Sequence, residues 1–588
     1  MSKPTLSLKN RMSHSPCGGQ ALLLASFGVL VTAISGHAQI SLPPAGESGI
    51  VEKSLRQSQP EFRPPLERPP EIMIEDSRSL EDPGAGPTFV VKRIKLEGNT
   101  LFSDEDLAPF IDMGDSLKVT LGILNLMANE ITHHYVQAGY ILTRTFIPAQ
   151  RIENGVVKIL VVEGTLGDIE VFDNERISTE AILDRMQPVR DEKILREQTL
   201  TRVLLQMNDA LGFEVKTVLK PGSRVGTTDM ALKVKETRPY AISLDADNFG
   251  SRFTGKLRMG VTAKVGNIFA LGDRFSMRAV KSNEDQLFLN LSFDYPINNY
   301  GTRVGLSFIY SDFTLGDSLA PLQAAGDSAL YTLNVTHPFY RSRSAEFYLT
   351  LGGEYREFRN SDLFGPTSDD QLAGVFLTAG GLFTDAFQAR TYYALRLQQG
   401  FTEGDLSDPL NSRNLGSGEV LIASLSIKRY QKAFIGKSYF IIRGNFQWAN
   451  DRVLSADQFA IGGFGTVRGY PLAEFAQDNG LAVSLEYVVP FPFKVALTDN
   501  PKMKTLDQLV SFFGFIDHAR VYAIDPQPGE VNREITGVGF GIRVNIPPWS
   551  PAIPAFSMTT SIGFPEFVKT EPSDRSDHTF YLGGVISY

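Results

Sequence analysis

The sequence contains one cysteine, Cys17, among its 588 residues. Cys17 falls inside an N-terminal stretch with the features of a secretory signal peptide, so the processed chain is expected to contain no cysteine. Disulfide bonds, thiolate nucleophiles and metal sites built on thiolates are therefore excluded. No lipobox-like sequence surrounds Cys17, so a lipid anchor is not expected either.

Long hydrophobic runs are also missing. Three basic residues near the start precede an apolar run over residues 21–34, and Gly36-His37-Ala38 follows as a small-x-small cleavage site. This order predicts a signal peptide over residues 1–38, with a retained signal anchor as the alternative. The run is too short to span a bilayer as a helix, and no later stretch approaches twenty apolar residues. With 10% aromatic residues, such a chain is typical of a transmembrane barrel or a large secreted all-β protein.

The sequence has neither a basic block nor a common catalytic motif. Its net charge is −9, so a nucleic-acid surface is not expected. The seven histidines form no metal-binding cluster, because His133 and His134 are adjacent on a predicted helix and point to different faces. We expect no metal, no cofactor and no enzymatic activity. A barrel enzyme remains an alternative, but its one hint is His518 beside Asp517, and these two side chains should face opposite ways.

Residues 39–87 are polar and rich in proline, a composition that buries no core and behaves as a semi-rigid linker. Within this segment, residues 47–59 (ESGIVEKSLRQSQ) contain no proline. They are compatible with a short polar helix that plugs a pore, or with simple disorder. The sequence leaves both open.

The stretch from 88 to 237 predicts two copies of one α+β module. The first copy, 88–164, comprises a strand over 89–99, a helix start at Ser103, a longer helix over 121–138, and strands over 143–149 and 156–162. The second copy, 165–237, comprises a strand over 168–172, a helix start at Ser178, a longer helix over 196–210, and strands over 215–219 and 230–234. The glycines that end the two longer helices, Gly139 and Gly212, are 73 positions apart. The order of the elements and the residues at the helix ends therefore agree between the two copies.

From residue 238 to 588 the helical pattern disappears and strands alternate with loops rich in Gly, Asn, Asp and Ser. At about ten residues per strand plus about twelve per connection, this length accommodates roughly 16 antiparallel strands of a transmembrane β-barrel. Long polar loops are expected at 361–371 and 402–417, and a tight turn at 297–300. In the last strand, Phe580, Leu582, Ile586 and Tyr588 share one face, which suits a wall with lipid on one side.

Two segments break the strand pattern. Residues 459–470 (FAIGGFGTVRGY) are rich in glycine but lack phosphate-loop spacing. Residues 512–521 place Asp517 within an otherwise apolar strand, on the same face as Phe513 and Phe515. Because an ionised carboxylate facing lipid is costly, this face should point into the barrel, and Asp517 should find a cation there.

Val467-Arg468-Gly469-Tyr470, followed by Gly514-Phe515-Ile516-Asp517, resembles the signature pair of the outer-membrane superfamily that contains two-partner secretion transporters and barrel-assembly translocases. Residues 247–255 (DNFGSRFTG) resemble the first barrel strand of ShlB/FhaC/HecB-type transporters, and the two modules resemble polypeptide-transport-associated (POTRA) domains. The resemblance implies a loop folded into the barrel whose arginine pairs with the aspartate. It also implies two periplasmic modules before a barrel of about 16 antiparallel strands.

The function implied by the resemblance is secretion of an unfolded exoprotein partner across the outer membrane. A barrel-assembly factor and a plain porin remain alternatives. We expect a monomer that contacts outer-membrane lipid, is inserted by the barrel assembly machinery and binds no nucleic acid. The candidate residues are, for the loop latch, Val467, Arg468, Gly469, Tyr470, Gly514, Phe515 and Asp517; for partner binding, Leu124, Ile131, Tyr135, Thr143, Arg144, Thr145 and Phe146; and for the membrane-insertion signal, Phe580, Leu582, Ile586 and Tyr588.

Overall fold

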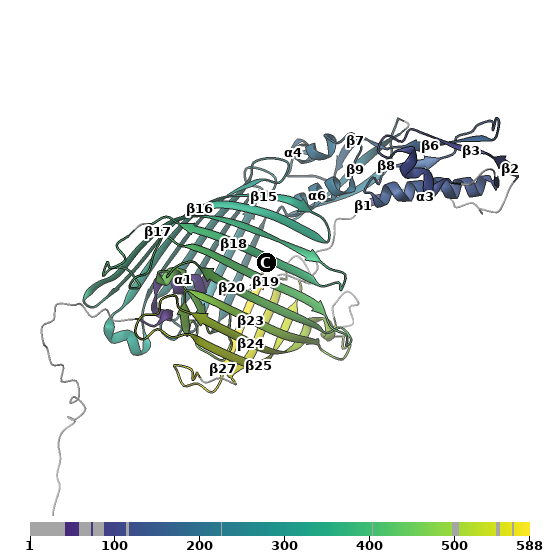
Figure 1. Ribbon diagram of the computed structural model, residues 1–588. Coiled ribbons are helices and arrows are strands. Elements are labelled where there is room, and N and C mark those ends of the chain that lie inside the picture. The colour runs from purple at the N-terminus through teal and green to yellow at the C-terminus, as the bar shows by residue number, and fades with distance from the viewer. Residues whose placement is uncertain are drawn as a thin grey trace, which may run out of the picture. The chain divides into compact units, whose positions relative to one another are not determined.

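Sixteen antiparallel strands form a closed barrel in the computed structural model (Figure 1), as predicted. The model describes residues 42–57, 72–74, 87–112, 117–224, 226–402, 404–496, 505–548, 553–566 and 570–588. Each barrel strand pairs with the next along the chain, and β10 pairs with β27 to close the ring. The strands are β10 (Tyr240–Asp247), β11 (Arg258–Gly266), β12 (Arg274–Ser282), β13 (Gln286–Pro296), β14 (Arg303–Thr314), β15 (Ala325–Arg341), β16 (Ala345–Asp362), β17 (Gly365–Thr384), β18 (Arg390–Gly400), β19 (Leu421–Lys432), β20 (Tyr439–Ala449), β23 (Asn479–Pro490), β24 (Val510–Tyr522), β25 (Arg533–Ile546), β26 (Ala555–Pro565) and β27 (Thr579–Ser587).

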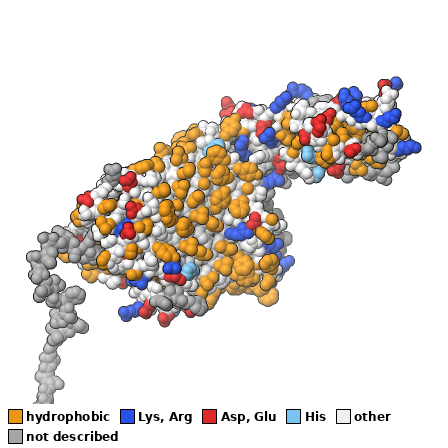
Figure 2. Space-filling model, viewed as in Figure 1, with side chains coloured by type: hydrophobic (Ala, Val, Ile, Leu, Met, Phe, Trp, Pro, Cys, Tyr) orange, Lys and Arg blue, Asp and Glu red, His pale blue; other side chains and the backbone are white. Residues whose placement is uncertain are grey.

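The barrel wall is apolar outside because its side chains alternate between the two faces. In β24, Phe512 and Ile516 are exposed, whereas Phe513, Phe515 and Asp517 are buried, which is the orientation predicted for this strand. Figure 2 shows hydrophobic side chains over much of the wall. The four residues proposed as an insertion signal face outward as well: Phe580, Leu582, Ile586 and Tyr588 are exposed.

The prediction of one loop is wrong. Residues 361–371 are not a long polar loop, because β16 continues to Asp362 and β17 begins at Gly365. Their polar residues alternate between faces, and Ser368 and Asp370 are buried inside the barrel. A strand that lines a polar interior carries the same composition as a loop, so composition alone misassigned this segment. The 402–417 segment, in contrast, lies in a loop between β18 and β19.

The first module packs one long helix on a small sheet. The sheet has the order β3-β6-β5, and β2 and β4 form a separate two-stranded sheet. The elements are β2 (Thr88–Val91), β3 (Arg93–Glu97), α2 (Asp104–Leu107), a 3-10 turn (Ala108–Phe110), β4 (Leu117–Thr120), α3 (Leu121–Gln137), β5 (Arg144–Phe146) and β6 (Val156–Val162). Thr120 caps α3 by accepting a hydrogen bond from the Ile123 amide. The short strand β4 had no counterpart in the sequence analysis.

The second module repeats this order with longer strands. Its elements are β7 (Thr165–Phe172), α4 (Thr179–Arg185), α5 (Gln187–Arg190), α6 (Glu197–Asn208), β8 (Phe213–Pro221) and β9 (Thr227–Glu236). In its sheet β7 runs parallel to β9, and β8 pairs antiparallel with β9. The helices cover one face of this sheet, with Leu200, Leu204 and Val215 fully buried between the layers.

A half-buried carboxylate occupies the same position in both modules. Glu163, after the last strand of the first module, accepts hydrogen bonds from the amides of Thr100 and Leu101 at 2.6 and 2.8 Å and from the Tyr135 hydroxyl at 2.8 Å. Burial alone would raise the pKa of Glu163, but the hydrogen bonds from Thr100, Leu101 and Tyr135 outweigh it and lower that pKa. Glu236, 73 positions later, accepts in the same way from the amides of Glu175, Arg176 and Ile177. Each module thus uses one carboxylate to fix the turn that leads into its first helix.

A ten-residue helix, α1 (Ser48–Gln57), lies among the barrel strands (Figure 1). A 3-10 turn (Pro44–Gly46) precedes it. Ile50, Val51 and Leu55 pack against inward residues of the wall, including Phe288 and Phe358. Among the described residues, helices are all too short or too polar to cross a membrane.

Candidate functional site

The segment between β20 and β23, residues 450–478, folds into the barrel and is called here the inward loop. It contains a 3-10 turn (Ser455–Asp457) and a small hairpin of β21 (Phe459–Ile461) and β22 (Phe475–Gln477). Its tip carries the predicted Val467-Arg468-Gly469-Tyr470 motif, and Val467, Arg468 and Tyr470 are each at most 1% exposed. A guanidinium this deeply buried requires anionic and hydrogen-bonding partners.

Arg468 finds those partners on two neighbouring wall strands. Its Nε and Nη2 donate to the two oxygens of Asp517 at 2.7 and 2.8 Å, and its own backbone amide donates to Asp517 at 3.1 Å. Its Nη1 donates to Glu486 at 2.7 Å. The guanidinium carbon also lies 3.4 Å from the centroid of the Phe515 ring. This bidentate and stacked geometry suits arginine and would not be reproduced by lysine.

The two acids differ in how much they depend on Arg468. Glu486 also accepts hydrogen bonds from Arg443 and Arg543. For Asp517, Arg468 is the one ion-pair partner among the described residues. Asp517 is fully buried, so loss of Arg468 would leave its carboxylate uncompensated, whereas Glu486 would keep two cations.

Glycines on the wall make room for the tip. A Cβ atom at Gly537 of β25 would lie 1.9 Å from the Arg468 carbonyl oxygen, and one at Gly563 of β26 would lie 2.7 Å from the Gly469 nitrogen. Gly469 itself has φ +103°, a conformation that favours glycine. The Gly469 amide donates to the Tyr581 hydroxyl of the last strand at 3.1 Å. The tip is thus held against five consecutive wall strands, β23 to β27.

The inward loop also contacts α1. A Cβ atom at Gly49 would lie 2.4 Å from the Cβ of Ala456, so helix and loop approach at backbone distance. Lys53 of α1 donates to the Gln458 carbonyl of the loop at 2.9 Å. At the other end of the helix, the Ser48 amide donates to Asn360 of β16 at 3.1 Å.

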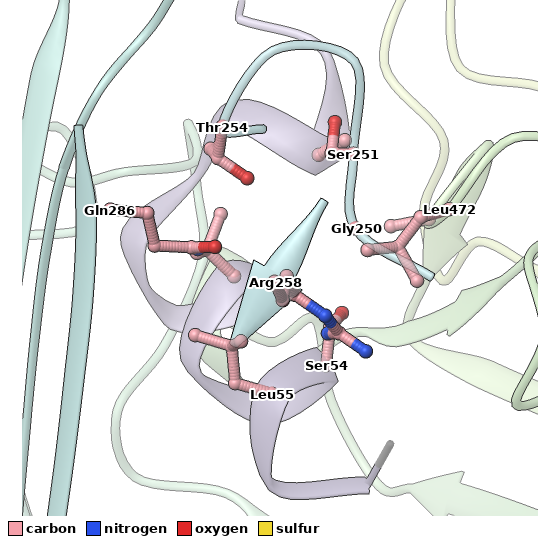
Figure 3. Close-up of a pocket in the computed structure, with 11 residues that line it drawn as sticks. Ser54, Leu55, Gly250, Ser251, Thr254, Arg258, Gln286 and Leu472 are labelled. Atoms are coloured by element: carbon pink, nitrogen blue, oxygen red, sulfur yellow. The ribbon is translucent and has the colours of Figure 1, made fainter. Parts of the chain in front are cut away.

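The wall holds this helix-binding part of the loop in place. Arg356 of β16 makes two hydrogen bonds, of 2.7 and 3.0 Å, to Asp457 of the loop. Figure 3 shows the opposite side of the helix, where Ser54 and Leu55 face Arg258 and Gln286 of the wall. Helix and loop together occupy the interior and share contacts with each other and with the wall.

The family model "haemolysin secretion/activation protein ShlB/FhaC/HecB" matches residues 226–544, more than half of the chain, and the ShlB-type POTRA model matches residues 89–164. The chain belongs to the ShlB/FhaC/HecB family. The heme/hemopexin transporter protein HuxB of Haemophilus influenzae is 26% identical over 68% of this chain and 72% of that protein. The outer membrane transporter CdiB of Escherichia coli is 24% identical over 75% of this chain and 76% of that protein. The solved CdiB structure from Escherichia coli has the same fold, with a TM-score of 0.70, 19% identity and coverage of 92% and 95%.

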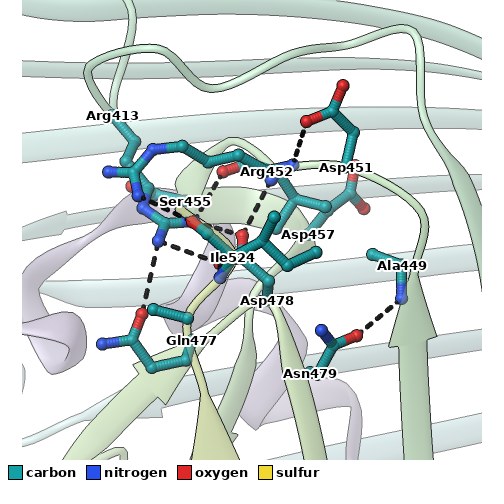
Figure 4. A network of polar contacts seen from close by, with 12 residues as sticks. Arg413, Ala449, Asp451, Arg452, Ser455, Asp457, Gln477, Asp478, Asn479 and Ile524 are labelled. Carbon is teal, nitrogen blue, oxygen red and sulfur yellow. Dashed lines mark hydrogen bonds and ion pairs between the residues drawn. The ribbon is translucent and has the colours of Figure 1, made fainter. Parts of the chain in front are cut away.

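Membership of the ShlB/FhaC/HecB family, a family of two-partner secretion transporters, places the barrel in the outer membrane and its POTRA domains in the periplasm. Because β10 begins directly after the second module and strands alternate in direction, the inward loop starts and ends at the external rim. There a polar network joins it to the 401–420 and 523–532 loops (Figure 4). Arg413 binds Asp478 and Glu530, and Arg452 binds Glu530 at 2.6 and 2.7 Å.

The partner-binding candidates of the first POTRA module require correction. Leu124, Ile131 and Tyr135 are at most 1% exposed and form the core of the module, so they do not line a surface groove. Thr143 and Thr145 are buried as well, whereas Arg144 and Phe146 are half-buried. A helical periodicity marks the face that packs on the sheet, so it does not identify a surface that binds a partner. A role of Arg144 and Phe146 in partner binding stays a prediction.

Sequence reasoning missed several residues around Arg468 in this ShlB/FhaC/HecB-family chain. Glu486, Arg443 and Arg543 complete the ion cluster around Arg468, and Gly537 and Gly563 accommodate its backbone. Glu486 carried a usable signal, because it is a lone acid between apolar residues of a predicted strand, as Asp517 is. The glycines carried none, because strand glycines are common throughout the barrel.

Proposed function

We propose that the protein recognises an unfolded exoprotein in the periplasm through its POTRA modules and secretes it through the barrel across the outer membrane. The observation that carries this proposal is the double closure of the interior. Both α1 and the inward loop lie among the inward residues of the wall, and neither is a strand of it. A segment that is not built into the wall can leave the interior without breaking the barrel.

The proposal treats Arg468 as a latch that holds the inward loop in its closed position. A desolvated arginine–carboxylate pair with bidentate geometry fixes one loop position, and removing one member typically costs about 3–5 kcal/mol. The contact of α1 with the same loop links the helix to this latch. Export then requires α1 to move aside, while the inward loop either opens or frames the path.

The partner is an exported protein in extended form. The relatives are named as a heme/hemopexin transporter, an outer membrane transporter and, in Serratia marcescens, a hemolysin transporter. Extended clients suit an exposed sheet edge, because main-chain pairing tolerates varied side chains. We propose that folding of the partner outside the cell supplies the driving force. We further propose that the chain acts as a monomer, since one chain closes its own barrel, and that the barrel assembly machinery inserts it through the outward face of the last strand, Phe580 to Tyr588.

Comparison of secreted proteins between the native host and a strain without this gene tests the proposal. One or a few large proteins should disappear from the medium of the null strain. Deletion of residues 89–164 should abolish their export while a heat-modifiable barrel still reaches the outer membrane. Unchanged secretion in the null strain would refute the proposal, and a general loss of outer-membrane proteins would favour an assembly factor instead.

A further inference from the structure

A short strand from the linker covers one edge of the second POTRA module. Residues Ile72–Ile74 form β1, which pairs parallel with β8 in the register Ile72–Thr217, Met73–Val218 and Ile74–Leu219. The sheet order is therefore β1-β8-β9-β7, and β1 is the one strand of this sheet that does not belong to the module itself. Its residues lie between α1 and the first module in the sequence. The chain thus completes its own sheet edge with a segment of three residues.

The two modules differ at this edge. In the first module, β5 occupies the position that β8 has in the second, because both pair antiparallel with the strand that ends the module. β5 has three residues, and its outward Thr145 amide already donates to the Thr132 hydroxyl of α3 at 3.0 Å. β8 has nine residues, and the three opposite β1 are fully buried or nearly so. β8 therefore offers the longer edge for a paired strand.

The composition of the edge defines what fits on it. Thr217 and Leu219 are buried and Leu219 lies in the core beneath the helices, so an apolar strand suits that side of the β8 edge. The residues that flank the paired stretch on β8 are Lys216 and Lys220, both exposed. In the sequence, β1 is flanked by Glu71 and Glu75. In the sequence, the apolar residues 72–74 of β1 thus lie between two glutamates, whereas the residues 217–219 of β8 with which they pair lie between two lysines.

We propose that the β8 edge is the docking site for an extended segment of the exported partner, and that β1 is an intramolecular competitor that covers this edge until the partner arrives. The partner segment carries the same pattern as β1, an apolar triplet flanked by acidic residues. This inference rests on the proposed secretion function and names the surface through which the partner is recognised.

A tethered strand of three residues suits this role. Linkage through the chain gives β1 an effective concentration at the edge of the order of millimolar, so the edge stays covered when no partner is present. Three residues form few ladder hydrogen bonds, so a longer partner segment gains pairing along the rest of β8 that β1 does not use. A competing segment can bind only chains whose β8 edge is uncovered. Its apparent affinity is therefore its intrinsic affinity multiplied by the fraction of such chains.

A peptide-binding experiment tests the competition directly. The probe is a fluorescent peptide with the sequence of residues 69–78 (PPEIMIEDSR), added to the purified full-length chain in detergent. A variant with both Ile72→Pro and Met73→Pro loses whichever of the two amides faces β8, so it should bind the probe at least tenfold tighter than the unaltered chain. A peptide with lysines in place of the two glutamates should bind neither protein. Equal probe affinity for variant and unaltered chain would overturn the proposal.

A cysteine lock tests the same edge during export. Met73→Cys with Val218→Cys joins β1 to β8, because paired strands lie about 4.8 Å apart, within the range that a disulfide bridges. The processed chain is expected to hold no other cysteine, so the bond formed in the oxidising periplasm is defined. The matched control is Glu214→Cys with Lys235→Cys, which joins β8 to β9 and leaves β1 free. The lock should reduce export at least tenfold and a reductant should restore it, while the control pair should export normally.

The two possible failures are distinguishable. If the chain exports a partner and the oxidised β1–β8 lock exports as much as the control pair, the docking proposal is overturned and the secretion function stands. If the unaltered chain exports nothing that the null strain lacks, the secretion function itself fails.

Discussion

Variants at Arg468 and Asp517 distinguish two roles for this ion pair. As a latch, the pair holds the inward loop in a closed position that it can leave during export; as a structural staple, it only stabilises the folded barrel. The perturbation is a cycle of Arg468→Met, Asp517→Leu and the double variant. In Arg468→Met, the fully buried Asp517 carboxylate keeps no cation among the described residues, so a loss of about 3–5 kcal/mol is expected. Glu486 keeps Arg443 and Arg543, which limits the damage to one acid.

The double variant removes both charges together. Apolar replacement of a buried ion pair is often neutral or stabilising, so the double variant should recover most of the loss. The two single losses should therefore not add, and their coupling free energy should be at least about 2 kcal/mol. Stability is measured as the temperature at which the folded barrel changes its mobility on SDS gels, and function as the amount of exported partner in the medium.

The latch and the staple differ in the double variant. If the pair is a latch, the double variant is stable but exports poorly, because the loop has lost the switchable contact that returns it to one position. If the double variant recovers stability and export together, the latch is refuted. If Arg468→Met is as stable as the unaltered chain, the burial argument is wrong as well.

Three further predictions concern other parts of the chain. Gly49→Val places side-chain atoms where Ala456 already lies, so it should displace α1 and raise single-channel conductance in planar bilayers. The control Gln57→Val, at an exposed position of the same helix, should leave the conductance unchanged. Equal conductance of Gly49→Val and the unaltered chain would show that α1 does not obstruct the pore. Glu163→Gln should cost about 2 kcal/mol and speed hydrogen exchange at Thr100 and Leu101 about 30-fold. Because the pKa of Glu163 is lowered in the folded chain, its contribution to stability is present at neutral pH and is lost as the pH falls through that pKa. In acid, hydrogen exchange at Thr100 and Leu101 in the unaltered chain should therefore approach the rate in the variant. A ratio of the two rates that does not change with pH would contradict this. Glu530→Gln should loosen the 523–532 loop, because Arg413 and Arg452 lose their shared acid, and added protease should cleave it faster on intact cells than in the control Glu534→Gln, which alters an exposed pair.

Much of the fold could be predicted because its signals are periodic and local. The alternation of Phe513, Phe515 and Asp517 against Phe512 and Ile516 has a period of two, and it identifies both the strand and its inward face. Gly139 directly follows the C-cap of α3 in the left-handed region, where glycine is favoured. Gly212 also has a positive φ, but it lies in the turn after α6, which ends at Asn208, so the 73-residue spacing identifies the module repeat although the predicted helix end was wrong.

The rest depends on contacts between distant residues. The same period of two continues through residues 361–371, where polar composition misleadingly indicated a loop. The burial of Leu124, Ile131 and Tyr135 shows that an apolar helical face packs first on its own sheet and is not free to bind a partner. Neither the position of Gly537 beneath Arg468 nor the pairing of Ile72–Ile74 with β8 has a local cause, since each joins segments far apart in the sequence.

The seam of the barrel has a consequence for its biogenesis. β10 and β27 pair from Ser243–Ser587 to Asp247–Gly583, so the first wall strand waits for a partner that is synthesised about 340 residues later. Until the barrel closes, the growing sheet has two unpaired edges, and each can pair with a strand of another protein molecule. Closure over so large a sequence distance is slow. Newly made molecules therefore need an escort that shields both edges, and an overproduced chain should accumulate as aggregates when such escorts are scarce.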